Sequence, residues 1–215
     1  MFSGIVEAKG AIVRAEAVLP GKLTRIWVER PTEFNDLKLG DSVASDGVCL
    51  TVEAVEDTTI QFALAAETLA ITSWNSRGKS GAEFLVGREV NLERSLRLGD
   101  RIHGHLVSGH VDSASRVVRI QDEKEMRIID VEIPKALRGM VWKKGSWALN
   151  GVSLTVNNVD GGIASHCLIP ETLQRTNLGK LTVGDFVNIE VDTFARALAQ
   201  SVETYIQEHG LGKNA

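Results

Sequence analysis

The chain contains Gly47-Val48-Cys49-Leu50-Thr51-Val52 and repeats this pattern 104 positions later as Gly151-Val152-Ser153-Leu154-Thr155-Val156. An earlier segment, Ser3-Gly4-Ile5-Val6-Glu7, returns in the same way as Ser108-Gly109-His110-Val111-Asp112. The matching segments keep their order along almost the whole chain, and their spacing exceeds the roughly 20–50 residues of solenoid repeats. The sequence therefore predicts a duplicated domain, and a duplicated domain offers two similar sites for one kind of small molecule.

Composition narrows the class of protein. The chain has 215 residues, of which 43% are hydrophobic and 24% charged, with a formal net charge of −4. Two small domains fit this length, and the lack of a long basic run argues against nucleic acid as a partner. No apolar run approaches the ~20 residues of a membrane span, and the first residues belong to a repeat segment rather than to a signal peptide. Cys49 and Cys167 are not equivalent in the repeat, so we expect no disulfide and a cytoplasmic location.

Each half is expected to consist of strands. Segments such as Leu23–Val28 and Val117–Ile120 are short and rich in β-branched residues, and turn signals separate them. Without intervening helical patterns, such strands favour antiparallel barrels or sandwiches over βαβ units. We expect a short helical turn after each Glu-Thr-Leu segment, a fuller one around Lys135, and a loop at residues 74–81.

The last part of the chain has no copy in the first half. Thr193 is a suitable N-cap, and Phe194, Leu198, Val202 and Ile206 recur every four residues before Gly210. This pattern predicts an amphipathic helix of about four turns. Its apolar face either packs on its own barrel or is buried against another subunit, and we favour the second because each half already has residues for its own core.

The sequence carries no convincing motif for a metal or a nucleotide. It lacks a Gly-rich phosphate loop and paired Cys-x-x-Cys segments. His103 and His105 would share one face of a strand, which makes a zinc site conceivable, but His110 has no geometric support as a third ligand. The alternative is that these histidines line a pocket or cross between domains. We therefore predict no metal site and no nucleotide-binding loop.

The more informative signal is the position at which the two copies differ. Cys49 in the first copy stands where Ser153 stands in the second, and Asp46 stands where Asn150 stands. All four are small polar side chains that can donate or accept hydrogen bonds, and thiols and hydroxyls can also act as nucleophiles. Either residue alone could be an ordinary buried Cys or a satisfied hydroxyl. Their equivalence suggests two pockets of similar shape with different roles.

The motifs resemble those of one family, the α-chain type of riboflavin synthase. The resemblance covers both halves, through Met1–Glu7, Asp46–Val52, Gly104–Asp112, Asn150–Val156, Ile169–Leu173 and Val187–Asp192. Departures are His103 in place of the usual Gly, the longer loop at 74–81 and a loosely matched tail.

The resemblance implies an all-β fold of two tandem, pseudo-symmetric, six-stranded antiparallel Greek-key barrels, residues 1–105 and 106–192, and a C-terminal helix in 193–215 that gathers three chains. Each barrel would bind one 6,7-dimethyl-8-ribityllumazine. One molecule would give a four-carbon unit to the other, yielding riboflavin and 5-amino-6-ribitylamino-uracil without a cofactor. The productive pair of pockets would form between neighbouring subunits, and lumazine synthase is a further partner to test.

The resemblance also implies site residues. The catalytic set would be Cys49, His110, Asn150, Ser153 and Asp192, with His110 relaying protons and Asn150, Ser153 and Asp192 acting on the donor molecule. Which barrel holds the donor is left open by the sequence. The first pocket would be lined by Gly4, Ile5, Val6, Cys49, Leu50, Thr51, Ala63, Leu64, Ala65, Ala66, Glu67 and Thr68. Gly109, His110 and Val111 would lie beside a ligand, in a barrel that the resemblance leaves open. The second would be lined by Lys144, Ser153, Leu154, Thr155, Cys167, Leu168, Ile169, Pro170, Glu171 and Thr172.

We expect proximity of two bound rings to lower the barrier, by up to roughly 7–11 kcal/mol in favourable cases, in a chain without a Ser-His-Asp arrangement. Two rival functions share the fold. A lumazine protein binds a chromophore without chemistry and would be expected to lose reactive groups such as Cys49 and Ser153. A flavin-dependent reductase would need a nicotinamide-binding domain, for which 215 residues leave no room.

Overall fold

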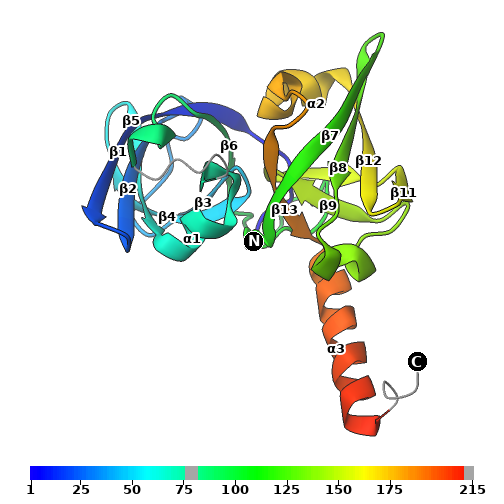
Figure 1. Ribbon diagram of the computed structural model, residues 1–215. Helices are drawn as coiled ribbons and strands as arrows, with labels where there is room; N and C mark the ends of the chain where they lie inside the picture. The colour runs from blue at the N-terminus through cyan, green and yellow to red at the C-terminus, as the bar shows by residue number, and fades with distance from the viewer. Residues whose placement is uncertain (76–81, 211–215) are drawn as a thin grey trace.

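The computed structural model describes residues 1–75 and 82–210. Two barrel-like sheets lie side by side, and a C-terminal helix projects from the second (Figure 1). This confirms the predicted pair of tandem β-barrels followed by a helix. The loop predicted at residues 74–81 lies, apart from its first two residues, outside the described part of the chain.

The first barrel is closed, with the strand order β1-β2-β5-β4-β3-β6 and antiparallel pairing throughout. Its strands are β1 (Ala8–Leu19), β2 (Leu23–Glu29), β3 (Ser42–Ser45), β4 (Val48–Val55), β5 (Thr59–Ala65) and β6 (Glu89–Arg94). Strands adjacent in the barrel but not in the chain, such as β2 and β5, make it a Greek key.

The second sheet repeats this arrangement in the order β10-β9-β13-β7-β8-β12-β11. Its strands are β7 (Ser113–Glu123), β8 (Met126–Glu132), β9 (Ser146–Leu149), β10 (Val152–Thr155), β11 (Asn158–Asp160), β12 (Ile163–Leu168) and β13 (Phe186–Val191). β10 and β11 together correspond to β4. The interruption falls at Asn157, whose counterpart Glu53 lies in the bulge of β4, so both copies bend the fourth strand at the same place.

Alternation of apolar and polar residues places one face of each strand in a core. In β5, Ile60, Phe62 and Leu64 are buried while their neighbours are not. The counterpart in β12 includes His166, which is fully buried in the second core. Its Nε2 accepts a hydrogen bond from Trp147 Nε1 at 2.7 Å, and its Nδ1 lies 2.9 Å from the Thr155 carbonyl oxygen. Burial lowers the pKa of His166 to about 4, so this imidazole is a neutral part of the core.

Short helices follow equivalent strands in the two halves. α1 (Ala66–Ile71) follows β5 and α2 (Pro170–Arg175) follows β12, and each contains its Glu-Thr-Leu segment rather than following it. Short 3₁₀ helices are formed by Ser73–Asn75, Ala82–Leu85, Lys135–Met140 and Asn177–Lys180.

The C-terminal helix α3 (Thr193–His209) begins one residue earlier than predicted. The N-cap is Asp192 and not Thr193, because the Asp192 carboxylate accepts hydrogen bonds from the Phe194 and Ala195 N–H groups. The helix ends at Gly210, which has the left-handed conformation typical of a C-terminal cap.

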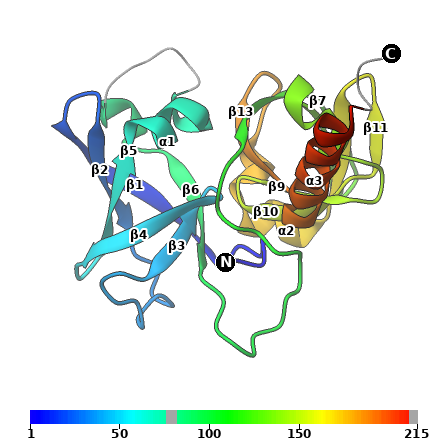
Figure 2. The same cartoon turned by 90° about the horizontal axis from the view of Figure 1, so that it is seen from below.

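The apolar face of α3 does not pack on its own barrel. Phe194 and Leu198 are 69% and 67% exposed, and Ala195 is its buried residue. Figure 2, the view from below, shows the helix foreshortened and in front of the second barrel. Packing on the same barrel, the first of the two alternatives, is therefore wrong for this chain, and the stripe remains available to another molecule.

Candidate functional site

β4 and β5 of the first barrel are paired at one end only, and we call the stretch where their pairing has stopped the first opening. These strands pair from Val55↔Ile60 to Val52↔Phe62, and no further pair joins them beyond that point. Leu50 and Leu64 are buried, so the alternating residues Cys49, Thr51, Ala63 and Ala65 face outward on the two sides of the opening. Unpaired strand edges offer backbone N–H and C=O groups to a flat, polar ring.

The second barrel has an equivalent opening. β10 pairs with β9 and β12 pairs with β8 and β11, but β10 and β12 do not pair with each other. Ser153 and Thr155 face outward on one side and Cys167 on the other, while Leu154 and Leu168 belong to the core. The side chains of all four predicted leucines, at 50, 64, 154 and 168, belong to the cores, so only their backbone atoms are left to face the openings.

A cavity of about 900 Å³ lies next to the second opening. It is lined by Ile169 and Pro170 together with the β7–β8 turn, including Met126. The Cys167 Sγ atom lies 3.7 Å from Met126 Sδ, which joins the cavity to the outward face of β12.

The segments that precede β1 and β7 are exchanged between the two barrels. Gly4 packs on Ser153 of the second barrel: a Cβ on Gly4 would lie 2.6 Å from Ser153 Cβ, and the Ser153 N–H donates to the Gly4 carbonyl at 2.7 Å. Gly109 packs on Cys49 of the first barrel in the same way, at 2.5 Å and 2.9 Å. Figure 1 shows the N-terminus between the barrels.

This exchange corrects the predicted grouping of the site residues. Gly4, Ile5 and Val6 were expected in the first pocket, but Gly4 contacts Ser153 and Val6 is part of the second core. Gly109, His110 and Val111 had been assigned to neither barrel; Val111 is part of the first core, and Gly109 lies on Cys49. The sequence repeat aligns the segment before β1 with the segment before β7, but it does not show which barrel each segment packs against.

Ser153 has a histidine partner that the sequence prediction missed. His105 Nδ1 lies 2.7 Å from Ser153 Oγ, and His105 Nε2 is buried without a hydrogen-bond partner in the described part of the chain. His103 and His105 lie in the irregular linker between β6 and β7, so the prediction that they share one face of a strand is wrong. No group of His, Cys, Asp and Glu within residues 1–75 and 82–210 could hold a metal ion.

Two opposing effects act on His105. Burial lowers its pKa, and the negative charge of Asp192 raises it by a smaller amount. The imidazole is therefore neutral near pH 7 and can accept a proton from the serine hydroxyl. Asp192 acts on His105 through its charge, while its carboxylate accepts the N–H groups at the start of α3, so the described residues form a Ser-His pair without a hydrogen-bonded aspartate.

Asn150 lies in the contact between the barrels. Its Oδ1 accepts from the Asn188 N–H at 2.8 Å, and its Nδ2 donates to Asn177 Oδ1 at 3.1 Å. The counterpart Asp46 accepts equivalent and additional bonds from Asn91 N–H, Asn177 Nδ2 and Trp74 Nε1. Because both polar atoms of the Asn150 side chain are already used, the structure places this residue in an interface network rather than beside the Ser153 hydroxyl.

The interface network has an approximate two-fold axis. A Cβ on Gly47 would lie 2.7 Å from the Gly151 nitrogen, and a Cβ on Gly151 would lie 2.8 Å from the Gly47 nitrogen. Both glycines have positive φ, at 80° and 77°, so only glycine fits both the backbone conformation and the close approach. The repeated motif therefore fixes the mutual position of the two openings.

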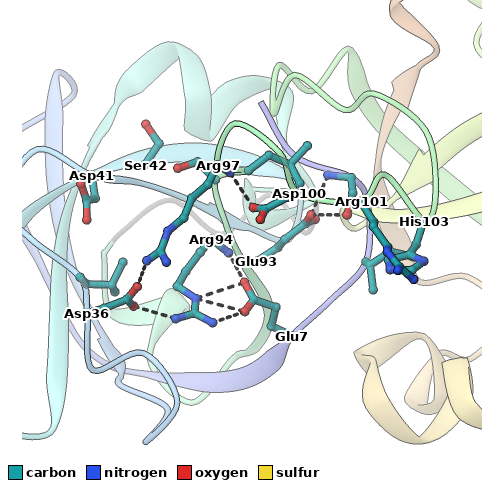
Figure 3. Close-up of a pocket in the computed structure, with 15 residues that line it drawn as sticks. Glu7, Asp36, Asp41, Ser42, Glu93, Arg94, Arg97, Asp100, Arg101 and His103 are labelled. Atoms are coloured by element: carbon teal, nitrogen blue, oxygen red, sulfur yellow. Dashed lines mark hydrogen bonds and ion pairs between the residues drawn. The ribbon is translucent and has the colours of Figure 1, made fainter.

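A separate, strongly polar cavity of about 630 Å³ lies where the first barrel meets the linker. Figure 3 shows the Arg94 guanidinium between the carboxylates of Glu7 and Asp36, with which it forms ion pairs. Arg94 also lies over the Phe34 ring at 4.7 Å. None of the outward-facing residues of the two openings lines this cavity, so it is not the candidate site.

The remaining predicted residues surround the openings. Lys144 has positive φ, at 71°, and its N–H donates to the carbonyl of Val156, where β10 ends. Ala66, Glu67 and Thr68 form the first turn of α1, and Glu171 and Thr172 lie in the first turn of α2 after Ile169 and Pro170. The helix starts therefore lie directly after the two strands β5 and β12 that border the openings.

Comparison with known proteins identifies both halves of the chain. The family model of the lumazine binding domain matches twice, over residues 3–95 and 108–192. Riboflavin synthase of Brucella abortus (strain 2308) is 38% identical over 202 residues, 93% of this chain and 97% of the relative. Riboflavin synthase of Chlamydia pneumoniae is 38% identical over 210 residues, 98% of this chain and 99% of the relative.

Solved structures show the same fold. The crystal structure of LumP complexed with riboflavin superposes with a TM-score of 0.78 at 24% identity, covering 89% of this chain and 99% of LumP. LumP complexed with 6,7-dimethyl-8-(1'-D-ribityl) lumazine gives a TM-score of 0.75 at 23% identity, with the same coverage.

Proposed function

The chain belongs to the riboflavin synthase family, and from this premise we propose that its two openings each bind one 6,7-dimethyl-8-ribityllumazine. The observation that carries the proposal is the pair of equivalent openings with unlike reactive side chains, Cys49 in one and Ser153 in the other. Two identical substrates must act differently in a dismutation, and unequal surroundings allow this. The chain is an enzyme of riboflavin synthesis, and we assign it to the transferases.

In the proposed reaction one lumazine transfers a four-carbon unit to the other. The acceptor becomes riboflavin and the donor becomes 5-amino-6-ribitylamino-uracil, so one substrate molecule is oxidised at the expense of the other and no cofactor takes part. The C7 methyl group of the lumazine is acidic because its carbanion delocalises into the ring. The protein has to hold two rings in reacting geometry and manage the protons.

We assign the second opening to the donor, on the basis of the Ser153–His105 pair. In the tautomer that carries its proton on Nε2, His105 accepts the Ser153 hydroxyl proton at Nδ1, which makes the oxygen a better nucleophile or a better orienting group for water at C7. Asp192 acts on His105 through its charge. Cys49 and His110 form the corresponding set at the first opening.

Asn150 takes a different role in this scheme from the one predicted. Its side chain is fully used by Asn188 and Asn177, so we propose that it supports catalysis by fixing the relative position of the barrels. We also propose the division of the chain into residues 1–105, 106–192 and 193–215. Because the segments that precede β1 and β7 each pack on the other barrel, each site contains residues from both of the first two divisions.

We propose that the chain forms a trimer through α3. The support is the exposed apolar stripe of the helix, which with Trp142 and Gly139 borders a largely apolar groove of about 720 Å³. A trimer would bring the first opening of one subunit toward the second opening of a neighbour. Association with lumazine synthase is a further partnership to test.

The described residues contain no helix long and apolar enough to cross a lipid bilayer. Both cysteines are free, and we propose a cytoplasmic location on that basis.

The proposed reaction is tested with the lumazine alone. Purified protein and 6,7-dimethyl-8-ribityllumazine are incubated without cofactor or metal, and products are separated by chromatography. We expect one riboflavin and one 5-amino-6-ribitylamino-uracil for every two lumazines consumed. Tight binding without product would contradict the proposal and identify a binding protein of the same fold.

The donor-side assignment is tested with Ser153→Ala and His105→Gln. Loss of a general base typically lowers the rate by roughly 10²–10⁴-fold, and we expect both variants to fall in that range. Thr58→Ala removes an exposed hydroxyl from the β4–β5 turn and serves as the control, with activity unchanged. Full activity in Ser153→Ala would overturn the assignment.

A further inference from the structure

Two buried carboxylates occupy equivalent positions near the ends of the last strands of the two barrels. Glu93 lies on β6 and Glu190 on β13, and they are 5% and 2% exposed. Neither forms a salt bridge within residues 1–75 and 82–210. Taking a carboxylate out of water is costly unless donors surround it.

The donors come from the exchanged segments. The Ser3 N–H and hydroxyl donate to one Glu93 oxygen at 2.7 and 2.9 Å, and the Gly4 N–H donates to the other at 3.1 Å. Glu190 binds Ser108 and Gly109 in the same pattern, at 2.7, 2.7 and 3.0 Å. Each carboxylate therefore acts as a clamp that fixes two consecutive residues of a segment without regular structure.

The clamped segments cover the reactive positions of the opposite barrels. Gly4, held by Glu93 of the first barrel, lies on Ser153 of the second, and Gly109, held by Glu190 of the second barrel, lies on Cys49 of the first. The glycines allow no other fit, because both have positive φ and any side chain would overlap the strand beneath.

We propose that Glu93 and Glu190 are positioning residues that act crosswise: Glu93 sets the geometry at Ser153 in the second barrel, and Glu190 sets the geometry at Cys49 in the first. The role of a carboxylate here is to accept several hydrogen bonds at once with both oxygens. An amide offers one acceptor and turns a donor toward the glycine N–H, so glutamine cannot replace it. The inference relies on the proposed function for what the two sites do, whereas the clamps themselves are independent of the reaction.

Burial has a measurable consequence at both clamps. It raises the pKa of Glu190 and raises that of Glu93 to about 7, although the donors from Ser3 and Gly4 counteract the effect. A carboxylate in such surroundings costs stability in its charged form. Its presence in both copies therefore fits a role in placing the segments rather than in stabilising the fold.

The test measures thiol accessibility and does not need the reaction. Cys49 is alkylated with N-ethylmaleimide in the unmodified protein, in Glu93→Gln and in Glu190→Gln, and peptide mass mapping reads it separately from Cys167. We expect Glu190→Gln to raise the Cys49 rate about tenfold, as the loss of a charge-assisted hydrogen-bond set allows the segment to lift, while Glu93→Gln leaves it within about twofold. The Cys167 rate is the internal control and should not change.

The reciprocal measurement uses Ser153→Cys as a reporter at the second site. There Glu93→Gln should raise the alkylation rate of the introduced thiol and Glu190→Gln should not. A same-barrel pattern, an effect of both variants on both thiols, or no effect would each overturn the proposal. If a Glu variant also exposes Cys167 through unfolding, Ser3→Ala and Ser108→Ala decide, since each removes only one hydroxyl of a clamp and should give the same crossed pattern at smaller amplitude.

Failure of the crossed pattern is distinguishable from failure of the proposed function. If the Glu variants show the crossed pattern of thiol alkylation rates but the protein makes no riboflavin, the clamp proposal stands and the proposed function fails. If the protein makes riboflavin but the Glu variants leave the thiol alkylation rates unchanged, the proposed reaction stands and the clamp proposal fails.

Discussion

The interface network around Asp46 and Asn150 predicts that their exchange is tolerated better than either change alone. A directional chain of hydrogen bonds links them: Asn150 Nδ2 donates to Asn177 Oδ1, and Asn177 Nδ2 donates to Asp46 Oδ1. Asn150→Asp replaces the first donor with an acceptor and adds a second carboxylate to a buried site. Asp46→Asn removes the buried charge but turns an N–H toward the Trp74 indole N–H, which now donates to Asp46.

The magnitudes follow from these contacts. Asn150→Asp leaves buried oxygens without donors and places like charges in one network, which we expect to cost about 3–5 kcal/mol of unfolding free energy. Asp46→Asn should cost about 1–2 kcal/mol, since one lost hydrogen bond is partly offset by removal of a buried charge. In the double variant the charge count returns to one, which removes the repulsion between two carboxylates, so the costs should fall short of their sum by about 1–2 kcal/mol.

Urea denaturation of the four proteins gives the coupling directly. Asn158→Asp is the control, because it makes the same replacement of an amide by a carboxylate at an exposed position of β11. Its unfolding free energy should differ from that of the unmodified protein by no more than about 0.5 kcal/mol. The pKa of Asp46 is raised by burial, and a second carboxylate there would be raised for the same reason and by repulsion. A group whose pKa is raised on folding keeps its proton in the folded state, so the cost of Asn150→Asp should be larger at pH 8 than at pH 5.

Additive costs would refute the network reasoning. Activity separates the two roles considered for Asn150. If it acts by fixing the barrels, riboflavin formation in the double variant should recover together with stability. Recovery of stability without activity would instead show that the amide takes part in the reaction itself.

Three further predictions follow from single sites. Gly109→Ala should cost about 2–4 kcal/mol, because left-handed strain adds to overlap with the strand beneath, whereas Gly21→Ala, with positive φ and nothing within 4 Å, should cost about 1 kcal/mol; equal costs in thermal denaturation would contradict the packing argument. The His166 pKa is about 4 in the folded chain and 6.5 in the unfolded chain, so about 3 kcal/mol of unfolding free energy is present above pH 6.5 and is lost as the pH falls toward 4. In His166→Phe, denaturation at several pH values should show no such dependence of the unfolding free energy on pH. If α3 forms the proposed trimer, Leu198→Glu on its exposed stripe should give a monomer in sedimentation velocity, and Gln200→Glu on the same helix should leave the trimer intact.

The duplicated barrel was predictable because its signals are local. Alternation in strands such as β5 and the turn residues between them depend on the chain a few residues either way. The repeat then required the second half to follow the first. The error in the C-terminal helix prediction, one residue at the N-cap, also has a local cause. Asp192 and Thr193 are both good N-caps, and the choice depends on which side chain reaches the free N–H groups.

The arrangement of the site was less predictable because it depends on contacts between the halves. The repeat aligned Gly4 with Gly109 but could not show that each lies on the opposite barrel. His105 was missed because it lies in the linker, where neither periodicity nor the repeat constrains a side chain, and its partner Ser153 is 48 residues away. Asn150 was assigned to the catalytic set through the family resemblance, whereas its hydrogen bonds with Asn177 and Asn188 become visible only in the folded chain.

The exchange of segments also explains why the two barrels belong in one chain. The first barrel closes its own ring of strands, yet Val111 from the second half completes its core and Gly109 covers Cys49. The second barrel in turn takes Val6 into its core. A separated half would therefore keep most of its strand pairing but would lose the cover of its reactive residue, because that cover and the carboxylate holding it come from the other half. Two unequal sites can diverge in chemistry under this arrangement while each continues to depend on the fold of its neighbour.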